Sequence, residues 1–348
     1  MVRNDIRHRI EEGEESLSPF AVRSRLSRGR VKPEEPCPMR TAFQRDRDRI
    51  IHSKAFRRLK HKTQVFIAPL GDHYVTRLTH TLEVSQIARS VARALNLNED
   101  LAEAISLGHD LGHTPFGHVG EEALNSLYPG GFRHSEQSLR VVDVLEKDGQ
   151  GLNLTWEVRD GILRHAKTGV DILGEDWGEV GTLEGQVNKV ADIIAYVNHD
   201  IGDAVRAGII SESDLPPEAS SVLGHSHSER INTLVTDVVD CSWAATGANG
   251  GGRPVIGMSP KVLEAAEVLR RFLFERVYRV ASEQSERARQ IIPVLYEYFV
   301  EHEEKLPEEY SLRDDSPERK AVDYIAGMTD NYAERVATEI LSGGAFLR

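Results

Sequence analysis

The stretch from Ile105 to Glu121 reads Ile-Ser-Leu-Gly-His-Asp-Leu-Gly-His-Thr-Pro-Phe-Gly-His-Val-Gly-Glu and decides how the rest of the chain is interpreted. It gathers three histidines, an aspartate and a glutamate among residues that are mostly apolar or glycine. Adjacent His109 and Asp110 offer one imidazole and one carboxylate, a nitrogen and oxygen set that suits Mg, Mn, Fe or Zn. The stretch therefore predicts a metal site of the kind that hydrolases use.

The composition is that of a globular protein with a substantial core, because 40% of the 348 residues are hydrophobic and 28% are charged. No apolar run approaches the ~20 residues of a membrane span, and the polar start lacks the apolar segment of a signal peptide. We therefore expect a cytoplasmic protein with no membrane partner. Cys37 and Cys241 stand far apart, so we expect free thiols rather than a disulfide or a zinc knuckle.

The charge is unevenly spread along the chain, whose formal net charge is −12. The segment Arg40 to Lys62 carries nine basic residues against Asp46 and Asp48, a local charge of +7 that leaves −19 elsewhere. Arginine and lysine are the usual partners of phosphate oxygens, so one interpretation is a site for a polyphosphate or a nucleic-acid strand. The alternative is a solvated helix face whose charges are balanced by acidic neighbours.

Apolar residues recur with helical spacing and strand alternation is scarce, which predicts an all-α chain. We expect a charged, loosely packed N-terminal arm over residues 1–38, a core over 39–210 and a C-terminal helical region over 211–348. Helices are predicted from Thr79 onward, from an Asn98 cap, and over 185–201, 260–299 and 317–341. The apolar stripe of the first of these helices is Leu82, Val84, Ile87, Ala88, Val91 and Leu95.

The predicted helix over 185–201 carries Asp192, Tyr196 and Asp200 at positions i, i+4 and i+8, which places them on one face. Asp192 lies near the apolar stripe, where a lone carboxylate would be costly unless it is paired or holds a cation. A salt-bridged carboxylate on a solvated face, and an ordinary tyrosine at the edge of the core, are the alternatives.

Several stretches together resemble the HD-domain metal-dependent phosphohydrolases. His80, His109-Asp110 and Asp192 follow the order and spacing of the H…HD…D signature. The closer resemblance is to the bacterial deoxyguanosine triphosphate triphosphohydrolase branch, and it extends roughly from Arg40 to Tyr332. It rests on Arg45–Leu59, Lys62-Thr-Gln-Val65, Arg77-Leu-Thr-His80, His109–Glu121 and Asp323–Asp330.

The resemblance implies an HD-domain helical fold with additional C-terminal helices, and a catalytic set for hydrolysis. His80, His109, Asp110 and Asp192 would be the four ligands of one divalent ion, whose identity among Mg, Mn, Co, Fe and Zn stays open. Water would attack the α-phosphate of a deoxynucleoside triphosphate, and the triphosphate would leave whole. His118 would protonate the leaving 5′ oxygen, since imidazoles exchange protons near neutral pH. Glu121 and His134 would orient or recharge His118.

The remaining contacts implied by the resemblance are with substrate. His113 would lie over the phosphates, or alternatively satisfy the helix end near Gly112. Arg77, one turn before His80, is the strongest candidate for a ligand of the phosphates. By the same resemblance, Gln64 and Asp200 would hydrogen-bond the 3′ hydroxyl of the sugar. Tyr196 would pack against the sugar where a 2′ hydroxyl would project, and Val65 would border it. Arg57 and Arg58 belong to the motif, and one of them would contact the substrate or a carboxylate of the fold.

The resemblance specifies the reaction better than the base, so preference for dGTP is only favoured, and the need for an activator nucleotide stays open. Asp323, Tyr324 and Asp330 would either close the base end of the pocket or serve packing. Homo-oligomers are expected from the family. Two other functions stay open: an HD-type phosphodiesterase or 5′-nucleotidase, and a module that binds single-stranded DNA through the basic segment, with a vestigial metal site.

Overall fold

The computed structural model describes residues 6–65, 74–166, 180–248, 254–278, 286–311 and 313–343. Within these residues regular structure is helical, and the only β contacts are isolated bridges between Arg30 and Thr155 and between Thr63 and Thr76. The predicted all-α class is confirmed. None of the described helices combines the length and the apolar character needed to cross a membrane. Cys37 and Cys241 are free thiols.

Two compact units are built from interleaved segments of the chain. Unit 1 takes residues 1–52, 80–109 and 152–277, and unit 2 takes 53–79, 110–151 and 278–348. The chain passes between the units at five places, one of which is the peptide bond between His109 and Asp110. These units differ from the contiguous regions 39–210 and 211–348, which stay a prediction.

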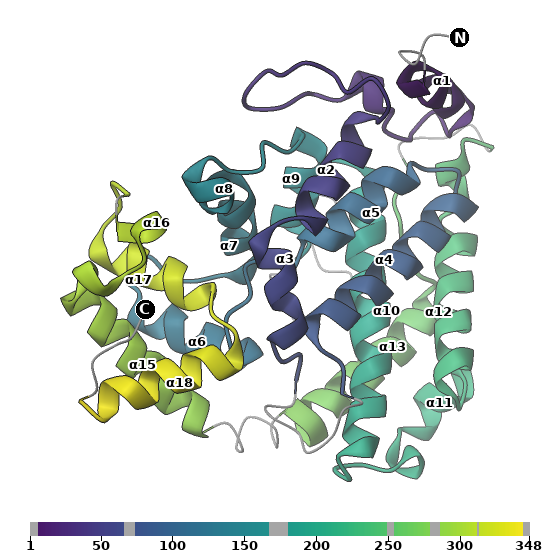
Figure 1. Cartoon of the computed structure of the whole chain (residues 1–348). Coiled ribbons are helices and arrows are strands. Elements are labelled where there is room, and N and C mark those ends of the chain that lie inside the picture. Colours follow the sequence, from purple (N-terminus) through teal and green to yellow (C-terminus); the bar gives the residue numbers. More distant parts are fainter. Residues whose placement is uncertain are drawn as a thin grey trace. The chain divides into compact units, whose positions relative to one another are not determined.

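Unit 1 is organised around the long helix α10, Leu183–Arg206 (Figure 1), and most residues of this helix are buried. Around it pack α5 (Glu99–Gly108), α9 (Trp156–Arg164), α12 (His227–Cys241) and α13 (Pro260–Leu273). The unit also contains α1 (Ile6–Gly13), α2 (Ala42–Ile51), α11 (Pro217–Leu223) and most of α4 (Arg77–Ala94). α10 is thus held from several sides, which fixes the side chains that it carries.

Local sequence explains where the helices of unit 1 begin. Asn98 caps α5, as predicted, because its side-chain oxygen accepts from the Leu101 amide at 3.2 Å. Thr182 caps α10 in the same way through the Gly185 amide at 3.0 Å. The predicted apolar stripe of α4 is buried at Val84, Ile87, Ala88, Val91 and Leu95. The prediction for Leu82 alone is wrong, because this residue lies on another face of the helix and is 51% exposed.

The N-terminal segment is packed more firmly than its charge and prolines suggest; residues 1–5 lie outside the described part. Glu14 accepts from the Ser24 amide and hydroxyl at 2.6 and 2.8 Å, and Glu184 of α10 accepts from the Val22 and Asn98 amides at 3.0 and 3.1 Å. Buried hydrogen bonds therefore hold residues 14–24, while the N-terminal arm over residues 1–38 stays a prediction. Burial raises the pKa of Glu184 to about 7.

Unit 2 is built on α15, Glu286–Glu301, which packs against α6 (Gly117–Leu127), α17 (Pro317–Ala326) and α18 (Asp330–Leu341) (Figure 1). Its core is rich in aromatic and aliphatic side chains, among them Phe132, Ile292, Phe299 and Ile325. The shorter helices are α3 (Lys54–Arg58), α7 (His134–Arg140), α8 (Glu146–Gly149) and α16 (Glu308–Ser311).

The two long C-terminal helical stretches are interrupted. The stretch 317–341 is divided into α17 and α18 at residues 327–329, where Asp330 uses its carboxylate to accept from the backbone amides of Thr63 and Phe116. In the stretch 260–299, α13 ends at Leu273 and is followed by a π-type turn over Phe274–Tyr278. Residues 279–285 of that prediction lie outside the described residues.

Candidate active site

Three predicted metal ligands of unit 1 come together. His80 on α4 places its Nε2 atom 3.1 Å from Asp192 Oδ1 on α10, and His109 at the end of α5 places its Nε2 atom 3.9 Å from the same oxygen. Both histidines are buried, with at most 1% of their surface exposed. The side chains come from three helices packed within one unit, so the tertiary fold assembles what the sequence separates by more than a hundred residues.

The second ring nitrogen of each histidine is held by another group of the unit. His109 Nδ1 lies 2.6 Å from the Ser106 carbonyl oxygen, and His80 Nδ1 lies 2.9 Å from His199 Nε2. His165 of α9 packs its ring edge against His109, with ring centroids 4.9 Å apart. Sequence reasoning missed His199 and His165, although the His199-Asp200 pair was a visible signal beside a predicted site residue.

This donor set fits a divalent cation. Ligand atoms that each lie about 2.1 Å from one ion are themselves separated by about 3–3.5 Å, which is close to the spacing of the two Nε2 atoms from Asp192 Oδ1. Imidazole nitrogen with carboxylate oxygen suits first-row metals and Mg. Asp110, the residue after His109, is the fourth ligand that the sequence predicts, and its role as a ligand stays a prediction.

The rest of the predicted stripe on α10 lies in unit 1 as well. Tyr196 is half-buried; burial raises the pKa of its phenol, and a hydrogen bond with Arg270 of α13 partly offsets this shift. Asp200 is buried, and its Oδ1 atom lies 2.8 Å from His199 Nδ1. Burial alone would lower the pKa of His199, but the carboxylate of Asp200 raises it.

In unit 2, Asp110 connects an arginine with a histidine. Its Oδ2 atom accepts from Arg77 Nη1 at 2.9 Å, and its Oδ1 atom lies 3.2 Å from His113 Nε2. Arg77 is 1% exposed, yet its Nε and Nη2 atoms have no hydrogen-bond partner among the described residues. The same holds for Gln64 Oε1, while half-buried Val65 directly precedes residues outside the described part. The two Arg77 nitrogens are buried donors that could receive an anion, whereas Gln64 Oε1 is an acceptor and could receive a hydroxyl.

Glu121 is the centre of a second histidine cluster in unit 2. It accepts from the ring of His134 at 2.9 and 3.0 Å, and it lies 3.6 Å from His118 Nδ1 and 4.0 Å from His113 Nδ1. Burial alone would raise the pKa of Glu121, but the surrounding imidazoles hold it well below its usual range. The His113 ring stacks on His134 with centroids 3.9 Å apart, and His118 is 74% exposed.

Tight backbone turns create this cluster. Phe116 and Gly117 both have left-handed φ angles, +63° and +58°, and α6 begins there, which presents His118 and Glu121 one turn apart. A Cβ atom at Gly112 would lie 2.1 Å from the Ser138 amide nitrogen, so only glycine allows α7 to approach the histidine-rich stretch. Burial and the neighbouring Arg77 and His134 lower the pKa of His113 well below its ordinary value.

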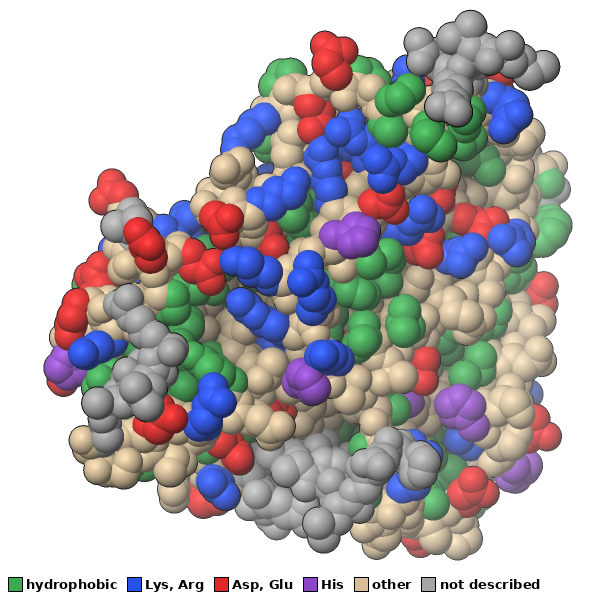
Figure 2. All heavy atoms as spheres, viewed as in Figure 1, with side chains coloured by type: hydrophobic (Ala, Val, Ile, Leu, Met, Phe, Trp, Pro, Cys, Tyr) green, Lys and Arg blue, Asp and Glu red, His purple; other side chains and the backbone are tan. Residues whose placement is uncertain are grey.

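The first half of the basic segment lies in unit 1 and is paired within the fold. Arg40 pairs with Asp48, Arg49 with Glu34 and Arg47 with Glu103, at 2.5, 2.7 and 3.0 Å. On the face shown in Figure 2, basic side chains lie interspersed with acidic ones. For this half, the interpretation as charges balanced by acidic neighbours is the one that the contacts support.

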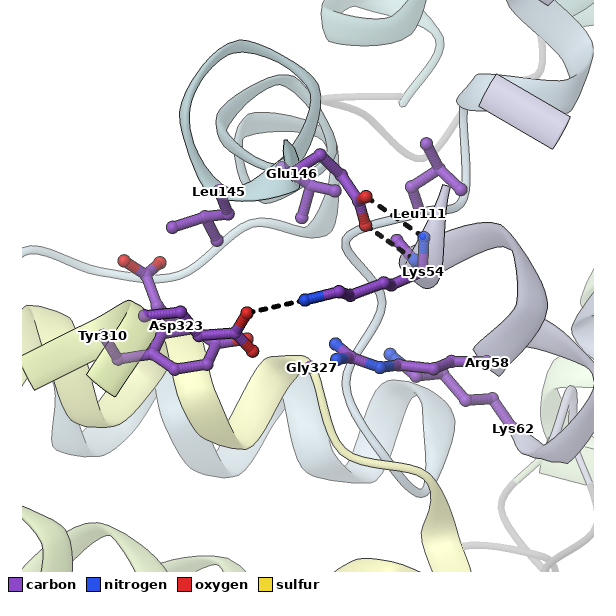
Figure 3. A pocket seen from close by; sticks show the side chains of 12 residues that line it. Lys54, Arg58, Lys62, Leu111, Leu145, Glu146, Tyr310, Asp323 and Gly327 are labelled. Atoms are coloured by element: carbon purple, nitrogen blue, oxygen red, sulfur yellow. Dashed lines mark hydrogen bonds and ion pairs between the residues drawn. The ribbon is translucent and has the colours of Figure 1, made fainter. Parts of the chain in front are cut away.

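The second half of the basic segment lies in unit 2 around a cavity of about 30 Å³ (Figure 3). Lys54 pairs with Asp148 and Glu309, Lys62 donates to the His113 and Ala326 carbonyl oxygens, and Arg58 bonds Tyr310. Burial lowers the pKa of Lys62 to about 7. The cavity has room for a water molecule but not for a nucleotide. Arg58 is half-buried and Arg57 is exposed, and the choice between substrate and fold for these two residues stays a prediction.

The C-terminal motif supplies packing contacts in unit 2. Asp323 accepts from Gln137 and Arg140 at 2.9 Å each, and Tyr324 shares a 2.8 Å hydrogen bond with Tyr332. Asp330 binds the two backbone amides described above. These contacts support the packing alternative for all three motif residues.

Comparison with known proteins adds two family matches and close relatives. Residues 77–197 match the HD domain, and residues 256–339 match the phosphohydrolase-associated domain. A deoxyguanosinetriphosphate triphosphohydrolase-like protein from Caldanaerobacter subterraneus subsp. tengcongensis is 58% identical to this chain, and the match covers 91% of this chain and 90% of that protein. A protein of the same name from Desulfatibacillum aliphaticivorans is 51% identical, and the match covers 94% of this chain and 95% of that protein. One from Clostridium tetani is 47% identical, covering 94% and 93%.

Proposed function

Because this chain belongs to the deoxyguanosinetriphosphate triphosphohydrolase-like family of HD-domain hydrolases, we propose that it hydrolyses deoxynucleoside triphosphates to a deoxynucleoside and inorganic triphosphate. The observation that supports this proposal best is the environment of Arg77. Its buried guanidinium spends one nitrogen on Asp110 and leaves two without a hydrogen-bond partner among the described residues. Burying such donors is costly unless an anion satisfies them, and a phosphate group is the anion that fits a guanidinium best.

The reaction we propose is attack of water on the α-phosphate, with the 5′ oxygen of the sugar as leaving group. A divalent cation bound by His80, His109, Asp110 and Asp192 would supply Lewis-acid polarisation of the phosphate. Arg77 would bind the phosphate oxygens and neutralise charge that develops on them. His113, which neighbours Arg77 through Asp110, would add a contact to the phosphates from a neutral imidazole.

Proton transfer in this proposal belongs to the cluster around Glu121. His118 would give its proton to the departing 5′ oxygen, since its exposed ring can exchange protons with water. Glu121, held as a carboxylate, would orient His118 through the Nδ1 atom 3.6 Å away. His134, which holds Glu121 from the other side at 2.9 Å, would restore the proton.

Recognition of the sugar completes the proposal. Gln64, with its buried side-chain oxygen, and Asp200 would bond the 3′ hydroxyl, and Val65 would border the sugar. Tyr196 would exclude a 2′ hydroxyl by its bulk. Guanine is favoured only because the relatives are named for deoxyguanosine triphosphate.

The experiment is to incubate the purified protein with Mg²⁺, Mn²⁺ or Co²⁺ and each of the four deoxynucleoside triphosphates, singly and mixed. Anion-exchange chromatography then identifies the phosphorus product. The proposal predicts intact triphosphate and free deoxynucleoside. Pyrophosphate would support the phosphodiesterase class, and orthophosphate the nucleotidase class. A third outcome is no turnover in any mixture. Together with salt-sensitive binding of single-stranded DNA that is unchanged in His109→Ala, this outcome would support the binding module.

Arg77→Lys and Arg77→Met test the observation that carries the proposal. Lysine keeps a positive charge toward Asp110 but loses the two free nitrogen donors of the planar guanidinium. We expect Arg77→Lys to raise KM for the triphosphate about tenfold or more, and Arg77→Met to lose measurable turnover. Unchanged KM in a folded Arg77→Lys protein would remove Arg77 from the substrate contacts.

A further inference from the structure

A chain of three side chains runs from the end of α10's polar stripe to the candidate metal ligand of α4. Asp200 Oδ1 lies 2.8 Å from His199 Nδ1, and His199 Nε2 lies 2.9 Å from His80 Nδ1. All three residues are buried, with exposures of 2%, 3% and 1% in that order. The rings of His80 and His199 meet edge to face, with centroids 5.1 Å apart and planes at 81°. The contact is therefore specific in direction.

The metal-binding role proposed for His80 decides where its ring proton lies. Asp200 Oδ1 lies 2.8 Å from His199 Nδ1 as a charged neighbour, in an ion-pair contact that does not by itself place a proton. For His80 Nε2 to bind a cation, the ring proton of His80 has to lie on Nδ1, where it would be donated to a lone pair on His199 Nε2, 2.9 Å away. With its proton on Nδ1, His80 keeps a lone pair on Nε2, the atom that faces Asp192 at 3.1 Å. A metal ion requires that lone pair.

His109 reaches the same state by a simpler route. Its Nδ1 atom lies 2.6 Å from the Ser106 carbonyl oxygen, which can only accept. The proton is therefore on Nδ1 and the lone pair is on Nε2, as in His80. One ligand is fixed by the backbone of its own helix, whereas the other depends on a histidine from a different helix, α10.

We propose that His199 is a positioning residue that holds His80 in the tautomer and orientation that bind the cation, and that Asp200 orients His199. This inference rests on the metal ligands of the proposed function. It also gives Asp200 a role in unit 1 that is separate from any contact with the sugar. Partners of this kind change metal affinity by about 10- to 100-fold when they are removed.

The test compares His199→Leu with His199→Gln. Leucine fills similar space but cannot accept from His80, whereas the glutamine side chain can accept with Oε1 and donate to Asp200 with its amide. Mn²⁺ affinity is measured by equilibrium dialysis with metal analysis, and the absorption spectrum of bound Co²⁺ reports the ligand geometry. We expect His199→Leu to bind Mn²⁺ about 10- to 100-fold more weakly and to alter the Co²⁺ spectrum, with His199→Gln recovering most of both.

Asn198→Ala is the matched control. Asn198 is a buried neighbour on α10 that bonds the Ile194 carbonyl oxygen and Arg230, away from His80. We expect this variant to lose stability but to keep the Mn²⁺ affinity of the wild type. Mn²⁺ affinity of His199→Leu within twofold of the wild type would overturn the proposal. Equal weakening in the leucine and glutamine variants would overturn it too, since packing alone would then explain the loss.

His80→Ala separates this inference from the proposed function. If His80→Ala loses Mn²⁺ while His199→Leu keeps it, the metal ligands stand and only the positioning role fails. If His80→Ala binds Mn²⁺ as the wild type does, the ligand assignment fails and the role of His199 fails with it.

Discussion

The two histidine clusters contain the same residue types but present opposite ring nitrogens to their carboxylates. In unit 1, His80 and His109 direct Nε2 atoms toward Asp192, at 3.1 and 3.9 Å. In unit 2, His134 and His118 direct Nδ1 atoms toward Glu121, at 2.9 and 3.6 Å. In the first cluster the Nδ1 atoms bond Ser106 and His199, so the lone pairs on the two Nε2 atoms can converge on one place. The second leaves an exposed imidazole beside a firmly ionised carboxylate.

The comparison indicates that the chemistry of such a cluster depends on which ring nitrogen of the histidine faces the carboxylate, and not only on the presence of both residue types. Lone pairs that converge in a buried place suit a cation. An imidazole that is oriented by a carboxylate and open to water suits proton transfer. Substitutions in the two clusters should therefore have separable effects on metal binding and on rate.

The largest expected effect comes from Asp192→Ala. Removing the oxygen on which both Nε2 atoms converge should abolish metal retention and turnover together, and Asp110→Ala should do the same. Metal content is measured by atomic emission after gel filtration, and turnover by product chromatography. Asp203→Asn is the matched control, because Asp203 is a buried carboxylate of the same helix that pairs with Arg206. Full metal content in Asp192→Ala would contradict the assignment of metal binding to the cluster in unit 1.

The next effect is on rate alone. His118→Ala should keep the metal and lose about 10²- to 10⁴-fold in kcat, the usual contribution of a general acid. His302→Ala is a matched control, since His302 is also an exposed histidine beside a glutamate, 3.5 Å from Glu304. A rate near that of the wild type in His118→Ala would assign the acid elsewhere.

A smaller effect is expected on the choice of sugar. Tyr196→Ala should reduce the preference for deoxynucleotides over ribonucleotides by about 10- to 100-fold, since steric exclusion of one hydroxyl is worth no more than ~10². Tyr196→Phe keeps the ring and loses only the hydroxyl that Arg270 bonds, so it should keep the preference. The measurement is the ratio of kcat/KM values for dGTP and GTP. An unchanged ratio in Tyr196→Ala would exclude the steric role.

The smallest expected effect is on the pH dependence of stability, and it comes from Glu184, a buried carboxylate whose pKa is not lowered by imidazoles. Burial raises the pKa of Glu184 to about 7, above the 4.5 of an ordinary glutamate, whereas Glu121 shifts the opposite way. The folded state therefore binds more protons between pH 4.5 and 7. This contribution to stability is complete below pH 4.5 and is lost as pH rises through 7, by at most about 3 kcal/mol.

Glu184→Gln should flatten that decline, because the amide oxygen still accepts from Val22 and Asn98 but does not ionise. The check is the free energy of unfolding by urea at pH 5 and pH 8 for both proteins. The same slope in both would mean that Glu184 does not titrate in this range, and that burial alone does not explain its difference from Glu121.

The sequence predicted what depends on neighbouring residues. The all-α class, the Asn98 cap and the stripe on α10 follow from helical spacing and capping chemistry, and the structure contains them. The error at Leu82 arises because apolar spacing alone does not set how wide a face of the helix the rest of the unit covers.

Features that depend on distant partners were beyond prediction. The carboxylates that pair the first half of the basic segment include Glu34 and Glu103, which no local pattern connects with Arg47 or Arg49. The contact of His199 with His80 joins residues 119 positions apart, and the ring nitrogen that faces a carboxylate is set by the tertiary fold. The sequence identifies the residues of a site more readily than the atoms that they present.

The most direct test of the proposed reaction is hydrolysis of dGTP by the wild-type protein with Mn²⁺ in water enriched in ¹⁸O. Attack on the α-phosphate predicts one ¹⁸O atom in each inorganic triphosphate and none in deoxyguanosine, as read by mass spectrometry of both products. Label in deoxyguanosine, or release of pyrophosphate or orthophosphate in place of triphosphate, would contradict the reaction assigned to the two clusters.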